Sequence, residues 1–200
     1  MGKNTTFSED ERDCLQEIMN IAYGSATAAI SEILDAFATL KIPKIEIINP
    51  SDLKIYLKDS LNRVGEQLIT TQLIDGDIAG ETLFVMDINS AKNLAKEFEG
   101  DDENLYDIVL EVSNILSSAT LGKFSEELSS EVSFSPPSIQ KLESIDQLDN
   151  RYVENYQQII IISTELDFED QKISGELLIL TKDDSIHWIQ ESINRILEAL

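Results

Sequence analysis

The stretch DCLQEIMNIAYGSATAAI, residues 13–30, has the periodicity of an amphipathic helix that buries one side and exposes the other. At about 100° per residue, its apolar side chains recur every three or four positions and form one continuous stripe. Asp13, Glu17, Asn20 and Gly24 fall on the opposite side, so the helix is predicted to present two carboxylates and one amide to solvent. The stripe comprises Leu15, Ile18, Met19, Ala22, Ala26, Ala29, Ile30, Ile33 and Phe37.

The polar pattern of this helix occurs a second time in the chain. In DIVLEVSNILSSATLGKF, residues 107–124, Asp107, Glu111 and Asn114 match the first three polar residues at a constant shift of 94 positions. One exposed set of this kind is explained by ordinary solvation of a helix face. Exposed positions drift freely after a duplication, so the survival of the same set in both helices favours a function.

The similarity extends beyond the helices. Pro137 matches Pro43 at the same shift of 94, and residues 170–193 resemble residues 75–98 at a shift of 95. Internal similarity at a fixed spacing indicates repeated structural units. The chain of 200 residues is therefore predicted to be a single domain built from two repeats, about 1–100 and 101–200.

Each repeat is predicted to contain a long helix, then β-rich runs, then a closing helix. The long helices are expected at about 8–38 and 103–129, and the closing helices at about 89–99 and 183–199. Ser8 to Glu11 has the pattern of a capping box, which supports the first helix start. The β-rich runs are KIEIINP (44–50), LKIYL (53–57), EQLITTQLID (66–75), GETLFVMD (80–87), VSFSPPSIQ (132–140), NYQQIIIISTEL (155–166) and GELLILT (175–181).

The connections between the strands indicate the fold class. DGDIAGE, residues 75–81, is typical of a tight hairpin turn, and QKISGE occupies the same place in the second repeat. Hairpins join antiparallel strands, whereas parallel strands need longer crossovers. The sequence thus predicts an α+β, internally duplicated, pseudo-twofold fold, with a mostly antiparallel central sheet and two long helices that carry the polar motif.

Composition excludes several classes of function. With 38 acidic and 15 basic residues, the formal charge of -23 repels phosphate backbones and anionic lipids, so no nucleic-acid partner is expected. No apolar run is long enough to cross a bilayer, and MGKNTTFSEDER lacks the apolar core of a signal peptide, so we expect no membrane insertion and a cytoplasmic protein. A single cysteine, Cys14, and a single histidine, His187, leave no multi-cysteine zinc site.

The repeated polar set suits one kind of chemistry. It contains no serine or cysteine nucleophile and no histidine, and the chain lacks a glycine-rich phosphate loop. An amide can hold and aim a water molecule, and a carboxylate can pair with a lysine of another protein. Phosphoryl transfer depends mostly on positioning and charge stabilisation, so these groups suit hydrolysis of a phosphoryl group carried by a partner protein.

The spacing D-x3-E-x2-N-x22-P resembles the active-site pattern of the CheC/CheX/FliY family of chemotaxis response-regulator phosphatases. The strand pair DIAGETLFVMD, residues 77–87, also resembles that family. Length and the presence of two intact motifs resemble CheC most. The pattern occurs at Asp13, Glu17, Asn20 and Pro43, and again at Asp107, Glu111, Asn114 and Pro137.

The resemblance implies a CheC-like fold and hydrolysis of the aspartyl phosphate of a CheY-type response regulator. It implies that Asn20 and Asn114 orient the attacking water, while Glu17 and Glu111 contact a lysine of the regulator. It implies that Mg²⁺ belongs to the regulator and that this chain carries no cofactor or metal of its own. The receptor deamidase CheD would be a second partner. Two further pairs would have supporting roles, Asp13 and Asp107 in docking, and Pro43 and Pro137 in shaping the chain.

Two other interpretations remain at this stage. The chain could be a binding module that regulates CheD or acts at the flagellar switch with little catalysis. It could also be a dimerisation domain in which the acids recur by chance, although this requires two coincidences. Intact Glu–Asn pairs in both repeats favour the enzyme. Family motifs often carry glycine before the asparagine, so the bulk of Met19 beside Asn20 leads us to expect unequal activity at the two sites.

Overall fold

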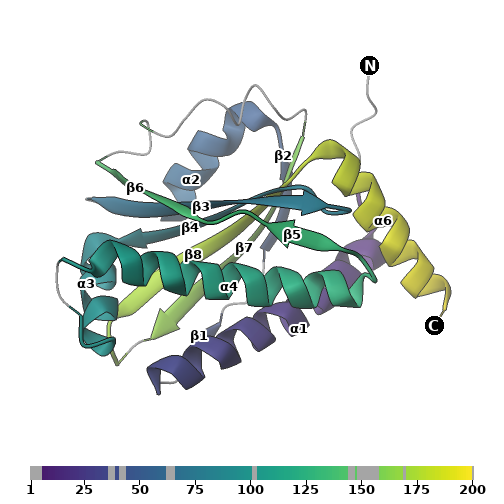
Figure 1. Cartoon of the computed structure of the whole chain (residues 1–200). Helices are drawn as coiled ribbons and strands as arrows, with labels where there is room; N and C mark the ends of the chain where they lie inside the picture. The colour runs from purple at the N-terminus through teal and green to yellow at the C-terminus, as the bar shows by residue number, and fades with distance from the viewer. Residues whose placement is uncertain are drawn as a thin grey trace.

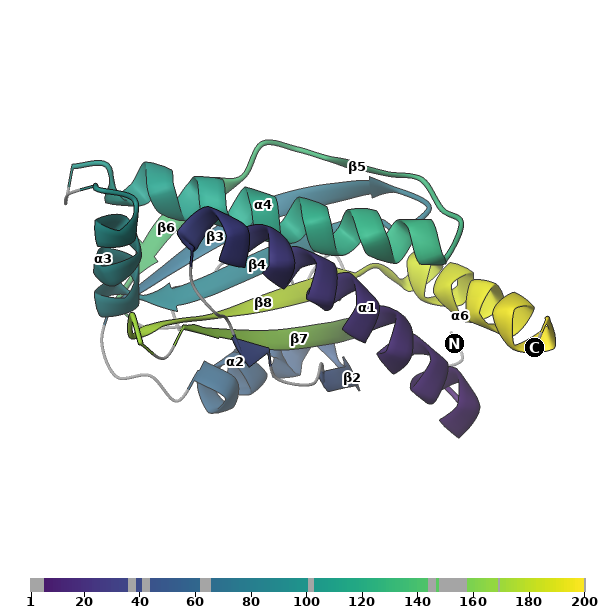
Figure 2. The ribbon, with the colours of Figure 1, turned by 90° about the horizontal axis from the view of Figure 1, so that it is seen from below.

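The structure, a computed structural model, describes residues 6–35, 39–40, 44–61, 66–100, 103–143, 147, 158–168 and 170–199. Helices pack on both faces of one sheet, with α1 and α4 on one face and α2 on the other (Figures 1 and 2). In chain order the elements are α1 (Glu9–Leu34), β1 (Thr39–Leu40), β2 (Lys44–Ile48), η1 (Pro50–Asp52), α2 (Leu53–Leu61), β3 (Gln67–Gly76), β4 (Gly80–Asp87), α3 (Ile88–Glu97), α4 (Leu105–Glu127), β5 (Val132–Phe134), β6 (Ser138–Leu142), β7 (Ile159–Phe168), β8 (Ile173–Thr181) and α6 (Asp183–Glu198).

Within the described residues the sheet has eight strands in the order β1-β7-β8-β4-β3-β5, while β2 pairs with β7 and β6 pairs with β3. Every strand pairing in the described part of the chain is antiparallel. The predicted α+β class with an antiparallel sheet and two long helices is therefore confirmed. None of the described helices has the length and apolar character needed to cross a membrane.

The centre of the sheet has pseudo-twofold symmetry. Strands β4 and β8 pair so that Leu83 lies opposite Leu178, and these two residues are 95 positions apart (178 minus 83). That separation equals the shift between the repeats, so the pseudo-twofold axis passes through this pair. Gly80 lies opposite Thr181, and Met86 lies opposite Gly175 in the matching position on the other side of the axis.

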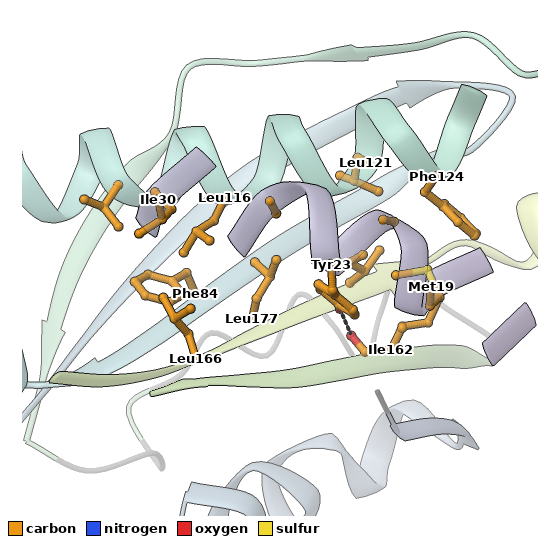
Figure 3. Close-up of a cluster of buried hydrophobic side chains, with 14 of the residues drawn as sticks. Met19, Tyr23, Ile30, Phe84, Leu116, Leu121, Phe124, Ile162, Leu166 and Leu177 are labelled. Atoms are coloured by element: carbon orange, nitrogen blue, oxygen red, sulfur yellow. Dashed lines mark hydrogen bonds between the residues drawn. The ribbon is translucent and has the colours of Figure 1, made fainter. Parts of the chain in front are cut away.

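The two repeats are interlocked rather than adjacent. Helix α1 packs on the hairpin of the second repeat, where the Tyr23 hydroxyl donates a 3.4 Å hydrogen bond to the Ile162 carbonyl (Figure 3). Helix α4 packs on the hairpin of the first repeat, where the hydroxyls of Thr82 and Ser117 are 3.1 Å apart. The edge strands are exchanged as well, since β2 pairs with β7 and β6 with β3. The predicted boundary near residue 100 stays a prediction, because residues 101 and 102 lie outside the described ranges.

Helix α1 begins as predicted, with a capping box. The Ser8 hydroxyl accepts a hydrogen bond from the Glu11 backbone N–H, and the Glu11 carboxylate accepts one from the Ser8 backbone N–H. Most of the predicted stripe is buried against the sheet (Figure 3). Ala29 is only partly buried, and Ile33 has 47% of its surface exposed in the last turn before Asp35 ends the helix in a left-handed conformation. Phe37 lies outside the described residues.

One predicted β-rich run is a helix. LKIYL, residues 53–57, forms the start of α2, because Pro50 opens a short 3-10 turn that leads directly into it. Leu53 and Leu57 are four residues apart, lie on one side of the helix and are both buried. They cover the second face of the sheet, in a core cluster that also contains Ile69, Leu83, Val85, Leu142, Ile159, Ile161, Leu178 and Leu180.

The predicted hairpin turn is present between β3 and β4. Gly76 has a φ of 124°, a backbone conformation that favours glycine. At Gly80, a β-carbon would collide with the carbonyl oxygen of Leu180 on the neighbouring strand. These two glycines therefore fix the turn and the close approach of β4 to β8.

Candidate functional site

The first polar set lies on the solvent side of α1. Asp13, Glu17 and Asn20 are all exposed, while Leu15 and Met19 point into the core and are fully buried. None of the three polar side chains has a hydrogen bond or ion pair with a described residue. The spacing of four and then three residues aligns them along one side of the helix.

The burial of Met19 bears on the expected inequality of the sites. We predicted that its bulk would narrow the site around Asn20, but Met19 is completely buried in the core between α1 and the sheet (Figure 3). The reason is helical geometry, because consecutive residues point about 100° apart. Met19 therefore does not obstruct Asn20, and that basis for unequal activity is wrong.

The second polar set lies on the solvent side of α4. Asp107, Glu111 and Asn114 are all exposed. Asp107 lies in the first turn of the helix, where a carboxylate also interacts favourably with the helix dipole. Asn114 differs from Asn20, because its Oδ1 accepts a 2.9 Å hydrogen bond from Nε2 of Gln72 on β3.

The two sets are on neighbouring helices but remain separate sites. Helices α1 and α4 lie side by side and antiparallel on the same face of the sheet (Figure 2). No hydrogen bond or ion pair between residues in the described ranges joins one set to the other. The arrangement offers two matching surfaces on one side of the molecule, each available to a separate docking event.

Of the two prolines of the motif, the structure describes one. Pro43 lies outside the described residues. Pro137 is half-buried in the segment that joins β5 to β6. Two residues earlier, the backbone carbonyl of Ser135 accepts a 2.9 Å hydrogen bond from Gln72, the side chain that also contacts Asn114. This position is compatible with the expected role of Pro137 in shaping the chain.

Two further residues border the first polar set. Gly24 follows Asn20 by one turn and is exposed, and a β-carbon added there would have no neighbour within 4 Å. Packing within the chain therefore does not require a glycine at this position. Ile21, beside Asn20, is 41% exposed, and Ile33 of the same helix is exposed to a similar extent. Ile21 lies outside the apolar stripe, so the sequence pattern alone places it on the outer side of the helix.

The electrostatics of both sets favour a cationic group from another molecule. Asp13 and Glu17 are one turn apart, as are Asp107 and Glu111, and like charges at this spacing destabilise a helix slightly. Among the described residues no lysine or arginine pairs with any of the four. A lysine from a partner would relieve the repulsion. The described residues contain no group of three or more histidine, cysteine, aspartate or glutamate side chains placed to hold a metal.

A nearby acid, Glu11, has a structural role instead. Its carboxylate is buried and accepts hydrogen bonds from Gln190 and Asn194 of α6. Burial acts to raise the pKa of Glu11, but hydrogen bonds from the Ser8 backbone, Gln190, Asn194 and the Ser8 side chain outweigh it and lower the pKa. Glu11 thus fixes the N-terminal end of α1 against α6.

No known family model matches the sequence. The crystal structure of FliY from Thermotoga maritima superposes with a TM-score of 0.75 at 20% identity, covering 96% of this chain and 99% of that chain. The chain has the FliY fold.

Other solved structures have the same fold at lower similarity. The FliM middle domain from Vibrio alginolyticus gives a TM-score of 0.63 at 13% identity, covering 89% of this chain and 99% of that chain. CheX from Desulfovibrio desulfuricans gives 0.54 at 13% identity, covering 83% and 99%. The resemblance to the CheC/CheX/FliY family is thus confirmed at the level of the fold. Because FliM shares that fold, the function has to be argued from the site.

Proposed function

We propose that this chain takes part in chemotaxis signalling as a phosphatase that hydrolyses the aspartyl phosphate of a CheY-type response regulator. The observation that carries the proposal is the pair of exposed Glu–Asn sets on α1 and α4, in a fold shared with FliY and CheX. Glu17 with Asn20, and Glu111 with Asn114, would form two catalytic surfaces.

In this mechanism the regulator docks on the outer side of one helix. The carboxylate of Glu17 or Glu111 pairs with a lysine in the regulator's active site and sets the docking register. The amide of Asn20 or Asn114 then lies at the phosphoryl group and orients a water molecule. Asp13 and Asp107, one turn earlier, add to the attraction for the basic group.

The reaction balances with water as the only other reactant. The water oxygen forms a bond to phosphorus while the bond between phosphorus and the aspartyl oxygen breaks. The products are the free aspartate carboxylate and inorganic phosphate, which takes up the protons of the water. Charge develops on the phosphoryl oxygens, and positioning together with electrostatic stabilisation supplies most of the catalysis. The Mg²⁺ that neutralises this charge would be held by the regulator.

The test is the decay of a purified CheY-type regulator that has been phosphorylated with a small-molecule phosphodonor. Asn20→Ala and Asn114→Ala each remove one site, and the double variant removes both. Loss of one preorganised group costs on the order of 10² in rate at its site, so the double variant should approach spontaneous decay. Asn89→Ala is a matched control, because Asn89 is an exposed asparagine near the start of α3 and belongs to neither set.

The main alternative is a binding module. The similarity to the FliM middle domain favours it, since that fold also occurs in a protein outside the CheC/CheX/FliY group. Such a module would act at the flagellar switch or bind CheD, and it would bind without accelerating phosphate loss. Equal decay with the wild type, the three variants and no added protein would reject the phosphatase in favour of this alternative.

A further inference from the structure

Beneath the second polar set lies a buried glutamine that the motif does not include. Gln72 is on β3 and only 3% of its surface is exposed. Its Nε2 is 2.9 Å from Oδ1 of Asn114 and 2.9 Å from the carbonyl oxygen of Ser135. The side chain thus links the helix that carries the site to the strand beneath it and to the segment before Pro137.

The Ser135 contact decides which way both amides face. A backbone carbonyl oxygen can only accept a hydrogen bond, so the Gln72 atom next to it must be the nitrogen. The same nitrogen faces Asn114, so the Asn114 atom that it contacts must be the oxygen. Nδ2 of Asn114 then points away from Gln72, and no residue in the described ranges accepts a hydrogen bond from it.

Packing alone does not explain a glutamine at this position. Gln72 occupies an inward-facing position of β3, on the same side as Leu68 and Ile74, which belong to the apolar core. Its Oε1 is buried, and no described residue donates a hydrogen bond to it. Burying an unpaired polar atom is unfavourable, and methionine would fill similar space without that penalty. The two hydrogen bonds that Nε2 donates therefore explain why a glutamine occupies this position.

The first polar set has no such support from the residues that the structure describes. Asn20 is exposed, and no described residue makes a hydrogen bond that would hold its amide in one orientation. The two sites are alike in their exposed residues but differ in how the asparagine is held. This difference, and not the bulk of Met19, is the physical basis on which we expect unequal activity at the two sites.

We propose that Gln72 is a positioning residue that holds Asn114 with its Nδ2 group facing the docked partner, which makes the second site the more active of the two. The proposal rests on the proposed phosphatase function. A side chain that is already held in one orientation does not have to be ordered as the phosphoryl group and its water reach the transition state, so the expected effect is on kcat. It also presents a fixed donor to the phosphoryl group and its attacking water.

Gln72→Met tests the proposal in two backgrounds. In Asn20→Ala, where only the second site acts, the substitution should lower kcat about threefold to tenfold, the range expected for one net hydrogen bond. KM should be unchanged, because the exposed docking residues remain. In Asn114→Ala, where only the first site acts, Gln72→Met should have no effect.

Gln67→Met is the matched control. Gln67 is on the same strand, is 7% exposed and has no side-chain hydrogen bond to a described residue. A general loss of strand stability would affect both substitutions and both backgrounds. Equal effects of Gln72→Met in the two backgrounds, or equal effects of the two glutamine variants, would overturn the positioning role.

A second readout does not depend on activity. The side-chain NH₂ signals of Gln72 should be protected from solvent exchange in the wild type, and Asn114→Ala should shift them and speed their exchange. Unchanged Gln72 signals would overturn the proposed contact whatever the kinetics show. If the wild type fails to accelerate phosphate loss while the signals do shift, the contact stands, but the phosphatase function and the catalytic part of the proposal are rejected.

Discussion

Gly24→Ala is expected to raise the stability of α1 and to weaken partner docking at the first site. Gly24 lies within α1 and is exposed, and an added β-carbon would have no neighbour within 4 Å. Alanine is favoured over glycine within a helix by about 1 kcal/mol. The substitution should therefore stabilise the folded protein by about that amount, which corresponds to about 2–4 °C in Tm for a chain of this size.

The effect on function should have the opposite sign. If the regulator approaches Gly24 closely, the new methyl group intrudes on a packed interface, for which overpacking costs about 1–3 kcal/mol. Since each 1.36 kcal/mol corresponds to a factor of ten, kcat/KM at the first site should fall roughly 5-fold to 150-fold. The assay is decay of the phosphorylated regulator in the Asn114→Ala background, which leaves only the first site active.

Gly122→Ala provides the control. Gly122 also lies within a helix, α4, and a β-carbon there would likewise have no neighbour within 4 Å. It is two turns beyond Asn114, so its substitution should stabilise the protein without lowering activity. A Gly24→Ala variant that is more stable and fully active would refute the idea that a partner approaches this face of α1.

Two further predictions concern stability. Because the pKa of Glu11 is lowered in the folded state, its contribution to the free energy of unfolding should be complete above its usual pKa and lost as the pH falls through the folded value. Acidification from about pH 7 to about pH 3.5 should therefore narrow the difference in stability between the wild type and Glu11→Gln, measured by urea unfolding. A difference that stays constant would contradict the hydrogen-bonded carboxylate. Leu83→Ala and Leu178→Ala, at the pseudo-twofold axis, should each cost about 2–5 kcal/mol by denaturant unfolding, and a loss below about 1 kcal/mol for either would contradict their complete burial.

Features encoded by local pattern could be predicted from the sequence. The capping box at Ser8 and Glu11, the apolar stripe of α1 and the hairpin at Gly76 depend on residues close together in the chain, and each is present in the structure. The exposure of both polar sets followed from helical periodicity. The prediction of a strand at LKIYL was wrong because its apolar residues fit both a strand and a short helix. The packing of Leu53 and Leu57 on the second face of the sheet decides for the helix.

Features that depend on distant residues were not visible in the sequence. The shift between the repeats predicts two similar units, but it does not say that each helix packs on the other repeat's hairpin. The link between Gln72 and Asn114 joins residues 42 positions apart and depends on where α4 crosses β3. A polar residue at an inward-facing position of a buried strand was its only local sign.

The exchange of helices and edge strands between the repeats has a consequence for how the protein is made. Tyr23 and its partner Ile162 are 139 positions apart, so the strand that α1 covers is synthesised long after the helix itself. Until then the N-terminal half holds apolar surface with nothing to bury it, a condition that slows folding and invites aggregation. A fragment limited to one repeat could complete its core only by exchanging segments with a second copy of itself.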